Sequence, residues 1–281
     1  MILHTYLTDG FIDWGELFIK SFRFYHGEDI PILLDARDLN DSQIKRLYQA
    51  GKNIKVNNKE IPYKELSKRL NLPINKIKKA KQNIEKGKQK GAVFWKQYIS
   101  VEDRYRNTIP EVVKQHLNSS HSHLLHMDID MYFNKPAYPI FELVEKNDIS
   151  IRFRPRIRNK HAKNQHKSDK RPPKRCVLGN IIGFKLDPSV LDFFEVWSKH
   201  IDKIPLQKKP AGYGQESFWY SFLETKNKYK WGNLHDLPRV TGLSTYCADG
   251  IVATGNKGNK KDRIKEYWND FNRKASHKGS N

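Results

Sequence analysis

The stretch HLLHMDIDMYF, from His123 to Phe133, holds an apolar run that ends in two aspartates, Asp128 and Asp130. The run predicts a buried strand, because an uncharged apolar segment of this length suits the interior of a parallel sheet. Side chains two positions apart on a strand point to the same face, so the two carboxylates are expected to lie together. Such carboxylates repel each other unless a cation lies between them, and oxygen ligands suit Mn²⁺ or Mg²⁺. The pattern predicts a metal site, unless one aspartate caps the next turn and the other faces water.

The residues before this stretch predict alternating strands and helices. Residues 2–7 and 31–34 are short apolar segments that indicate strands, and a helix is expected to begin at Asp41 as its cap. A strand–helix–strand–helix order is typical of an α/β fold with a parallel sheet. The first helix is indicated by apolar residues at the spacing of one helical face, between the turn Asp9-Gly10 and a stop at Gly27: Phe11, Gly15, Phe18, Ile19 and Phe22.

The rest of the chain adds two basic segments. Residues 60–118 are expected to be a mostly helical insertion, whose Lys64–Lys90 stretch is either a solvated helical face or a surface for a polyanion. Residues 152–175 contain many Arg and Lys with few apolar residues, which predicts a mobile basic loop. Without a repeat or a linker, residues 1–281 are predicted to form a single domain. Further elements are expected as strands at 149–153 and 177–184 and as helices near 141–145, after Asp187, after Gln215 and at 264–271.

The composition restricts the partners and the setting. The chain has 281 residues with 52 Lys and Arg against 31 Asp and Glu, a formal net charge of +21. This surplus indicates an anionic partner: nucleic acid, an acidic glycan or an anionic membrane face. The two cysteines, Cys176 and Cys247, exclude a disulfide framework and a four-cysteine zinc site. No apolar run is long enough to span a membrane and the start does not look like a signal peptide, so we expect a cytoplasmic protein, in the host cytoplasm if it is viral.

Taken in order, the segments resemble the GT-A fold glycosyltransferases, which use nucleotide-sugar donors. The segment Leu125–Asp130 resembles the metal-binding Asp-x-Asp strand of that family, and Ile2–Thr8 with the following helix resembles its nucleotide-binding start. The resemblance implies a GT-A-like (Rossmann-like), mostly parallel twisted sheet flanked by helices. Four further segments are similar to the family in chain order: Leu34-Asp35, Leu178–Phe184, Gly214–Phe218 and Gly255–Gly258.

The resemblance also implies an enzyme and its ligands. The activity would be transfer of a sugar from a nucleotide-sugar, a UDP-sugar, with Mn²⁺ or Mg²⁺ as cofactor. Asp130 and Asp128 would bind the metal, Asp128 through the metal or the donor ribose, which makes it a catalytic candidate. Glu216 is the second catalytic candidate, as an acid–base group or a ligand of sugar hydroxyls, although it equally suits a helix N-terminus. The nucleoside is expected near Thr5, Tyr6, Thr8 and Asp35, at the carboxyl ends of the first strands, and the diphosphate at Lys257 and Lys260.

Two positions depart from the family pattern. Many relatives have an acid before the glutamine, where this chain has Gly214. Relatives often carry a histidine before the C-terminal glycine, where this chain has Val252-Ala253-Thr254. A third protein ligand for the metal would then come from elsewhere, and His235 and Asp249 are the candidates.

The acceptor is predicted from the charge. Arginines alternate with Phe153, Pro155 and Ile157 at the start of the basic loop, a pattern that suits contact with a phosphate backbone and some stacking. We therefore expect a nucleic-acid acceptor, such as a modified DNA base that is flipped out of the duplex, as in phage-type DNA glycosylation. The residues expected to bind it are Arg152, Arg154, Arg156 and Arg158.

Three alternatives stay open at this point. A glycosyltransferase with these features could act on a cell-surface polysaccharide or a lipid-linked glycan, with its basic face on an anionic membrane. A non-enzymatic nucleic-acid-binding protein would explain the charge but not the buried Asp-x-Asp. A nuclease or nucleotidyltransferase would need a third carboxylate and a core motif that the sequence lacks.

Overall fold

The computed structural model describes residues 1–85, 98–153, 177–203, 213–237, 250–254 and 260–278. These residues belong to two compact units, each assembled from separate parts of the chain. Unit 1 comprises Met1–Glu60, His123–Lys146 and Leu234–Asn281, and unit 2 comprises Ile61–Ser122 and Asn147–Asn233. That all 281 residues form one domain stays a prediction. None of the described helices combines the length and apolar character needed to cross a membrane.

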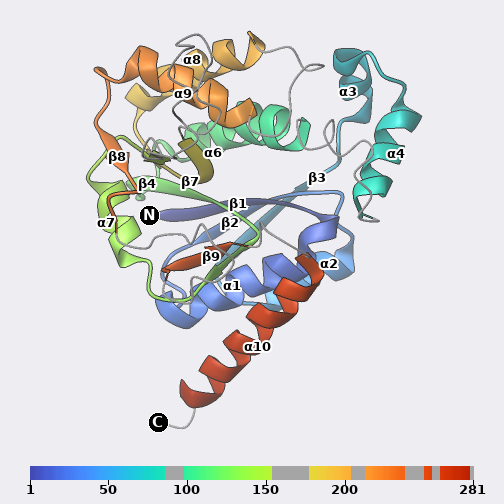
Figure 1. The fold of residues 1–281 in the computed structure, drawn as a ribbon, viewed down its shortest axis with the longest axis vertical. Helices are drawn as coiled ribbons and strands as arrows, with labels where there is room; N and C mark the ends of the chain where they lie inside the picture. Colours follow the sequence, from blue (N-terminus) through green and yellow to red (C-terminus); the bar gives the residue numbers. More distant parts are fainter. Residues whose placement is uncertain (86–97, 154–176, 204–212, 238–249, 255–259, 279–281) are drawn as a thin grey trace, which may run out of the picture. The chain divides into compact units, whose positions relative to one another are not determined.

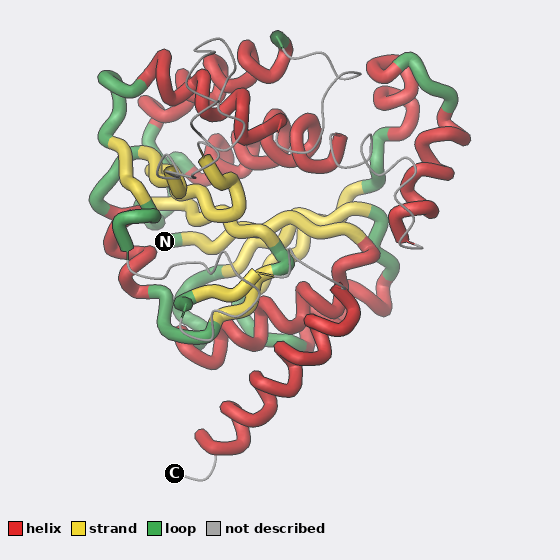
Figure 2. The backbone as a smooth tube through the Cα atoms, viewed as in Figure 1, coloured by secondary structure: helices red, strands yellow, loops and turns green. Residues whose placement is uncertain are grey.

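Unit 1 is built on a parallel sheet with the strand order β3-β2-β1-β4. Helices α1 and α10 lie on one face of this sheet, and α10 runs along α1 (Figure 1, Figure 2). A separate antiparallel pair joins β5 to β9. The strands are β1 (Ile2–Thr8), β2 (Ile32–Arg37), β3 (Ile54–Lys59), β4 (His123–Asp128), β5 (Met131–Phe133) and β9 (Val252–Thr254). The helices are η1 (Asp9–Phe11), α1 (Ile12–His26), α2 (Asp41–Gln49), α7 (Tyr138–Glu145) and α10 (Lys260–Lys278).

The apolar face predicted for the first helix forms the core beneath β1. Phe18, Ile19 and Phe22 are fully buried in α1. A Cβ atom at Gly15 would lie 2.9 Å from Leu47 Cδ2, so the Leu47 side chain of α2 packs directly against this glycine of α1. The helix ends at Gly27, whose φ of +61° favours glycine, as the sequence predicted.

Unit 2 contains a mixed sheet in which β6 pairs with β7 antiparallel and with β8 parallel. Its core is aromatic, and the rings of Phe193, Trp197, Phe218 and Trp231 pack within 6.1 Å of a neighbour in this set. The strands are β6 (Ile149–Phe153), β7 (Val177–Lys185) and β8 (Trp231–Asn233). The helices are α3 (Tyr63–Leu70), α4 (Ile74–Glu85), the π-helix η2 (Tyr98–Thr108), α6 (Ile109–His116), η4 (Pro188–Val190), α8 (Leu191–Asp202) and α9 (Tyr213–Thr225).

The predicted fold class is confirmed, and some details are corrected. Most of the described strand pairs are parallel, and most of the described residues of the expected insertion at 60–118 are helical. Asn40, not Asp41, caps α2, because its side chain accepts from the Gln43 N–H in a capping box. Strands β3, β8 and β9 were not predicted. Of the basic loop expected at 152–175, residues 154–175 lie outside the described residues.

Candidate functional site

Polar side chains meet on one face of the parallel sheet of unit 1. In the strand register, Tyr6 of β1 lies between Asp35 of β2 and Asp128 of β4. Neighbours in register share a face of the sheet, so these three side chains form one row. The Arg37 guanidinium lies over the Tyr6 ring, 5.2 Å from its centroid. Three of the residues predicted from the sequence are therefore brought together.

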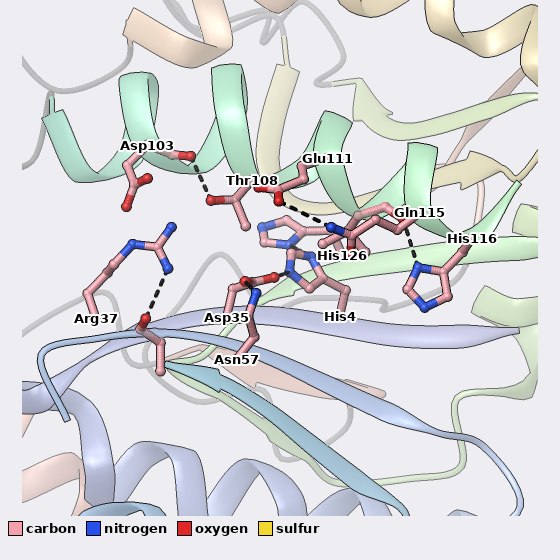
Figure 3. Close-up of polar contacts among 12 residues, drawn as sticks. His4, Asp35, Arg37, Asn57, Asp103, Thr108, Glu111, Gln115, His116 and His126 are labelled. Atoms are coloured by element: carbon pink, nitrogen blue, oxygen red, sulfur yellow. Dashed lines mark hydrogen bonds and ion pairs between the residues drawn. The ribbon is translucent and has the colours of Figure 1, made fainter. Parts of the chain in front are cut away.

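A buried network lies beside this row, and it includes two histidines (Figure 3). His4 Nε2 lies 3.0 Å from Asp35 Oδ2, and Asn57 Nδ2 donates to Asp35 Oδ1 at 2.7 Å. His126 Nδ1 lies 2.9 Å from His4 Nδ1. If His4 gives its Nε2 proton to Asp35, its Nδ1 is the acceptor and His126 donates. The sequence had placed Asp35 at the nucleoside; in the structure both of its oxygens hold neighbouring strands.

The two threonines proposed for the nucleoside lie in different places. Thr5 is fully buried on the opposite face of β1, which it shares with Leu3 and Leu7, and its Oγ1 finds no hydrogen-bond partner among the described residues. Thr8 ends β1 opposite Arg37 and is buried. Ligands of α/β sheets bind beyond the carboxyl ends of strands, so Thr8 has the position that suits a ligand and Thr5 does not.

The two aspartates of the Asp-x-Asp motif do not lie on one continuous strand. β4 ends at Asp128, and Ile129 and Asp130 form a turn that leads into β5. The expectation that both carboxylates project from an extended chain is therefore wrong for Asp130. Asp128 is half-buried and Asp130 is buried, with an exposed fraction of 6%.

Helix α10 contacts β5, which follows Asp130. The ring of Tyr267 stacks on that of Tyr132 at 5.3 Å, and the Tyr132 hydroxyl donates to Asp270 Oδ2 at 2.9 Å. Burial raises the pKa of Tyr267, and the negative charge of Asp130 contributes to the rise. Tyr267 therefore lies in the electrostatic neighbourhood of Asp130. The sequence showed Tyr267 only as one apolar position of an amphipathic helix.

The pairing of β5 with β9 brings a distant segment to the same place. Met131, which follows Asp130, is paired with Thr254, which precedes Gly255. The segment similar to the family's diphosphate-binding residues thus begins beside the Asp-x-Asp turn. Lys257 lies outside the described residues, as does the side chain of Lys260 at the start of α10.

The metal-binding capacity of this region rests on the two aspartates. Among the described residues, no group of three or more His, Cys, Asp and Glu side chains gathers at one point, so His235 does not join the pair. Asp249 is outside the described residues. An Mg²⁺ or Mn²⁺ ion held by one or two carboxylates completes its shell with substrate phosphates and water. The donor set, one carboxylate at the end of β4 and one in the turn after it, fits that kind of site.

Glu216 lies in unit 2, in the first turn of α9, and is buried. Ser217 anchors this turn: its hydroxyl accepts from Trp197 Nε1 at 3.0 Å and donates to the Gly214 carbonyl at 3.0 Å. Burial raises the pKa of Tyr220, and the Glu216 carboxylate one turn away adds to it. The Glu216 carboxylate therefore lies on a first helical turn that these hydrogen bonds of Ser217 hold in place.

The structure explains why a glycine stands where relatives carry an acid. A Cβ atom at Gly214 would lie 2.3 Å from Tyr105 Cε2, and one at Gly179 would lie 2.7 Å from the Tyr105 hydroxyl oxygen. Tyr105 is buried between α9 and β7 and donates to the Gly179 carbonyl at 3.2 Å. Its ring occupies the space that any side chain at position 214 would need.

Of the four arginines proposed for the acceptor, the structure describes one. Arg152 is in β6 and buried, with 8% exposed, so it belongs to the sheet of unit 2 and not to an exposed loop. Arg154, Arg156 and Arg158 lie outside the described residues. Asn180, on β7, was not singled out as a site residue; its Oδ1 is buried without a hydrogen-bond partner among the described residues. Such an acceptor is a candidate ligand contact.

Comparison with solved structures identifies the fold. The galactosyltransferase LgtC, solved with donor and acceptor sugar analogs, is similar over 95% of both chains with a TM-score of 0.54 and 10% identity. Mouse xyloside xylosyltransferase 1 is similar over 91% of this chain and 97% of its own, with a TM-score of 0.51 and 12% identity. The bifunctional glycosyltransferase WbbM matches 92% of this chain with 46% of its own, with a TM-score of 0.53 and 9% identity. No family model matches the chain, and no curated protein matches it in sequence. The chain has the fold of the GT-A glycosyltransferases.

Proposed function

We propose that the protein is a metal-dependent glycosyltransferase that moves a sugar from a nucleotide-sugar, a UDP-sugar, to a hydroxyl group of a nucleic acid. The observation that supports the proposal is that, within a GT-A fold, the Asp-x-Asp turn leads directly into β5, which pairs with β9. Asp128 ends β4 and Asp130 lies in the turn that follows it. Tyr6 lies in register with Asp128, and Thr254 is paired with Met131, which follows Asp130.

In this proposal the two aspartates bind the divalent ion. Thr8, Tyr6 and Arg37 contact the nucleoside of the donor. A divalent ion bound there would neutralise the diphosphate as a leaving group. Lys257 and Lys260 follow Thr254 closely in the sequence and would add positive charge to the same phosphates. Asp35 would act by holding His4 and Asn57, which keeps the row of side chains in place.

The chemical step requires an acceptor oxygen to bond to the anomeric carbon while the bond from that carbon to the diphosphate breaks. In an inverting reaction Glu216 would accept the proton of the acceptor hydroxyl, a contribution of ~10²–10⁴-fold to the rate. In a retaining reaction the same carboxylate would bind sugar hydroxyls. The configuration of the product at the anomeric carbon decides between these roles. Glu216→Gln is expected to keep donor binding and to lose transfer.

A nucleic-acid acceptor is supported by the net charge of +21, which a neutral sugar acceptor would not need. We propose a modified base in DNA, as in phage-type DNA glycosylation, with Arg154, Arg156 and Arg158 at the phosphates. A labelled UDP-sugar should transfer its label to duplex DNA that carries hydroxymethylated bases. Transfer to an acidic polysaccharide or a lipid-linked glycan, with none to DNA, would refute the nucleic-acid acceptor. The proposed glycosyltransferase activity would be retained.

The donor site is tested by thermal unfolding with Mn²⁺ and a panel of nucleotide-sugars. A ligand that binds only the native state stabilises it, by ~2.7 kcal/mol at a concentration one hundred times its Kd. We expect a stabilisation that needs both Mn²⁺ and the nucleotide-sugar and that disappears in Asp130→Asn. Asp29→Asn is the matched control, because Asp29 is exposed and precedes β2, at the amino end of the sheet. Equal stabilisation of both variants would refute the assignment of Asp130.

A further inference from the structure

The helices α3 and α4 of unit 2 form a small structure with its own core. Ile61, Leu66 and Ile77 are buried against one another, and Tyr63 and Leu72 pack on them. In Figure 1 the two helices lie side by side and apart from α8 and α9 of the same unit. The GT-A site described above does not use them.

The connection between the two helices is a sharp three-residue turn, Asn71 to Pro73. Asn71 has a φ of 49° and a ψ of 45°, the left-handed conformation that ends many helices. Its N–H donates to the Lys68 carbonyl at 3.3 Å, and the Leu72 N–H donates to the Ser67 carbonyl at 3.1 Å. These two bonds are those of a Schellman motif, which stops α3 and redirects the chain.

The turn is held in place by further contacts. The Ser67 hydroxyl donates to the Leu72 carbonyl at 2.7 Å. Pro73 precedes α4, where its fixed φ suits a helix start, and its carbonyl accepts from the Lys76 N–H at 2.9 Å. Leu72 turns inward to the shared core. The geometry is therefore a defined helix–turn–helix and not a long helix with a break.

The exposed surface of the α3–α4 pair is strongly basic. Residues 61–82 contain seven Lys and Arg and one acid, Glu65. The exposed lysines are Lys64 and Lys68 on α3 and Lys76, Lys78 and Lys79 on α4. A pair of helices gains nothing in stability from so many like charges, because they repel one another. A surface with this positive charge is suited to bind a polyanion.

The exposed face of α4 also carries amides. Asn75, Lys79 and Gln82 are exposed at positions i, i+4 and i+7, which share one face of a helix, and Lys76 lies beside them. Asn and Gln pair with adenine, and Lys pairs with guanine, in the major groove of DNA. A helix with this face, presented by a preceding helix and a tight turn, has the features of the second helix of a helix–turn–helix DNA-binding motif.

We propose that α3 and α4 bind duplex DNA as a helix–turn–helix unit. The first turns of α4 enter the major groove with Asn75, Lys76 and Lys79 at base edges, and Lys64 and Lys68 of α3 contact phosphates. The inference rests on the proposed function in that it gives a nucleic-acid acceptor its docking surface. Its physical basis lies in α3 and α4 alone, so it can be tested without sugar transfer.

The test is binding of the whole chain to labelled duplex DNA, without metal or nucleotide-sugar, at several salt concentrations. Lys76→Ala/Lys79→Ala is expected to weaken binding at least ~10-fold. Lys64→Ala/Lys68→Ala is expected to lower the log–log salt slope by ~1.8, or about 0.9 for each phosphate contact. Lys199→Ala/Lys226→Ala is the matched control, because it removes the same charge from exposed positions of the same unit. All these substitutions place alanine at exposed positions, and circular dichroism confirms that each variant is folded.

Three results would overturn the proposal: equal weakening by the control pair, tighter binding to single strands than to duplexes, or binding to vesicles with anionic headgroups in place of DNA. Selection from a random duplex pool should give the wild type a preferred sequence that Asn75→Ala relaxes at one position. DNA binding through α4 without any sugar transfer would overturn the proposed function only. If Lys76→Ala/Lys79→Ala changes neither the sugar transfer to DNA nor the affinity for DNA, this inference is overturned and the proposed function is not.

Discussion

His26, at the C-terminal end of α1, should make the stability of the protein depend on pH. Its Nε2 accepts a hydrogen bond from the Ala137 N–H at 2.9 Å, and its ring stacks on Phe22 at 4.7 Å. The side chain is buried, with 8% exposed. Burial lowers the pKa of His26 to about 4, and the positive charge of Arg23 contributes. A proton at Nε2 would also remove the acceptor that Ala137 needs.

The direction and size of the effect follow from these values. The unfolded chain takes up the proton near a pKa of ~6.5, whereas the folded chain takes it up only near 4. Between these values the unfolded state binds more protons, so the free energy of unfolding falls as the pH falls. For the step from about pH 7.5 to about pH 5, the two pKa values give a loss of ~2 kcal/mol from this one group.

The assay is urea unfolding of the wild type and of His26→Gln at both pH values. The glutamine Oε1 can accept from Ala137 in place of the imidazole nitrogen but does not titrate, so the variant should lose ~2 kcal/mol less than the wild type over the same step. His277→Gln is the control, because His277 is exposed in α10 and should behave like the wild type. Equal pH dependence of the wild type and His26→Gln would refute the reasoning.

Three further predictions concern packing, buried hydrogen bonds and backbone conformation. Gly214→Ala should lower the free energy of unfolding by ~1–3 kcal/mol through its clash with Tyr105, and Tyr105→Leu should cost less in that background than in the wild type, as a double-mutant cycle by urea unfolding would measure. Asp35→Ala should cost ~1–3 kcal/mol, because it leaves the buried His4 Nε2 and the Asn57 Nδ2 without their acceptor; a loss below ~0.5 kcal/mol would contradict this hydrogen-bonded network. Asn71→Gly should be tolerated while Asn71→Ala costs ~1 kcal/mol by calorimetry, since its positive φ suits glycine, and equal stabilities would argue against the left-handed turn.

Much of the first half of unit 1 could be predicted because its signals are local. The spacing of Phe18, Ile19 and Phe22 predicts the buried face of α1 whatever lies against it, and Gly27 marks the end of that helix. The apolar run before Asp128 predicts β4 for the same reason. The row of Tyr6, Asp35 and Asp128 also follows, since the carboxyl halves of neighbouring parallel strands must lie together.

Other features depend on residues far apart in the sequence. β3 has half-buried positions and several lysines and asparagines, so its periodicity is weak, and it becomes a strand by pairing with β2. The turn at Asp130 exists because β5 pairs with β9, whose residues follow more than a hundred positions later. The sequence shows Gly214 only as a departure from the family pattern, whereas the structure shows that the Tyr105 ring fills the space that a side chain at this position would need.

The sequence by itself therefore determined the α/β class, the order of the first elements and the pair of carboxylates. Only the tertiary structure decided that Asp35 is held by His4 and Asn57, that Thr5 faces the core, and that Tyr267 lies near Asp130. The physical reason is that periodicity and capping are properties of neighbouring residues. Hydrogen-bond partners and burial, in contrast, are set by which distant segments the chain brings into contact.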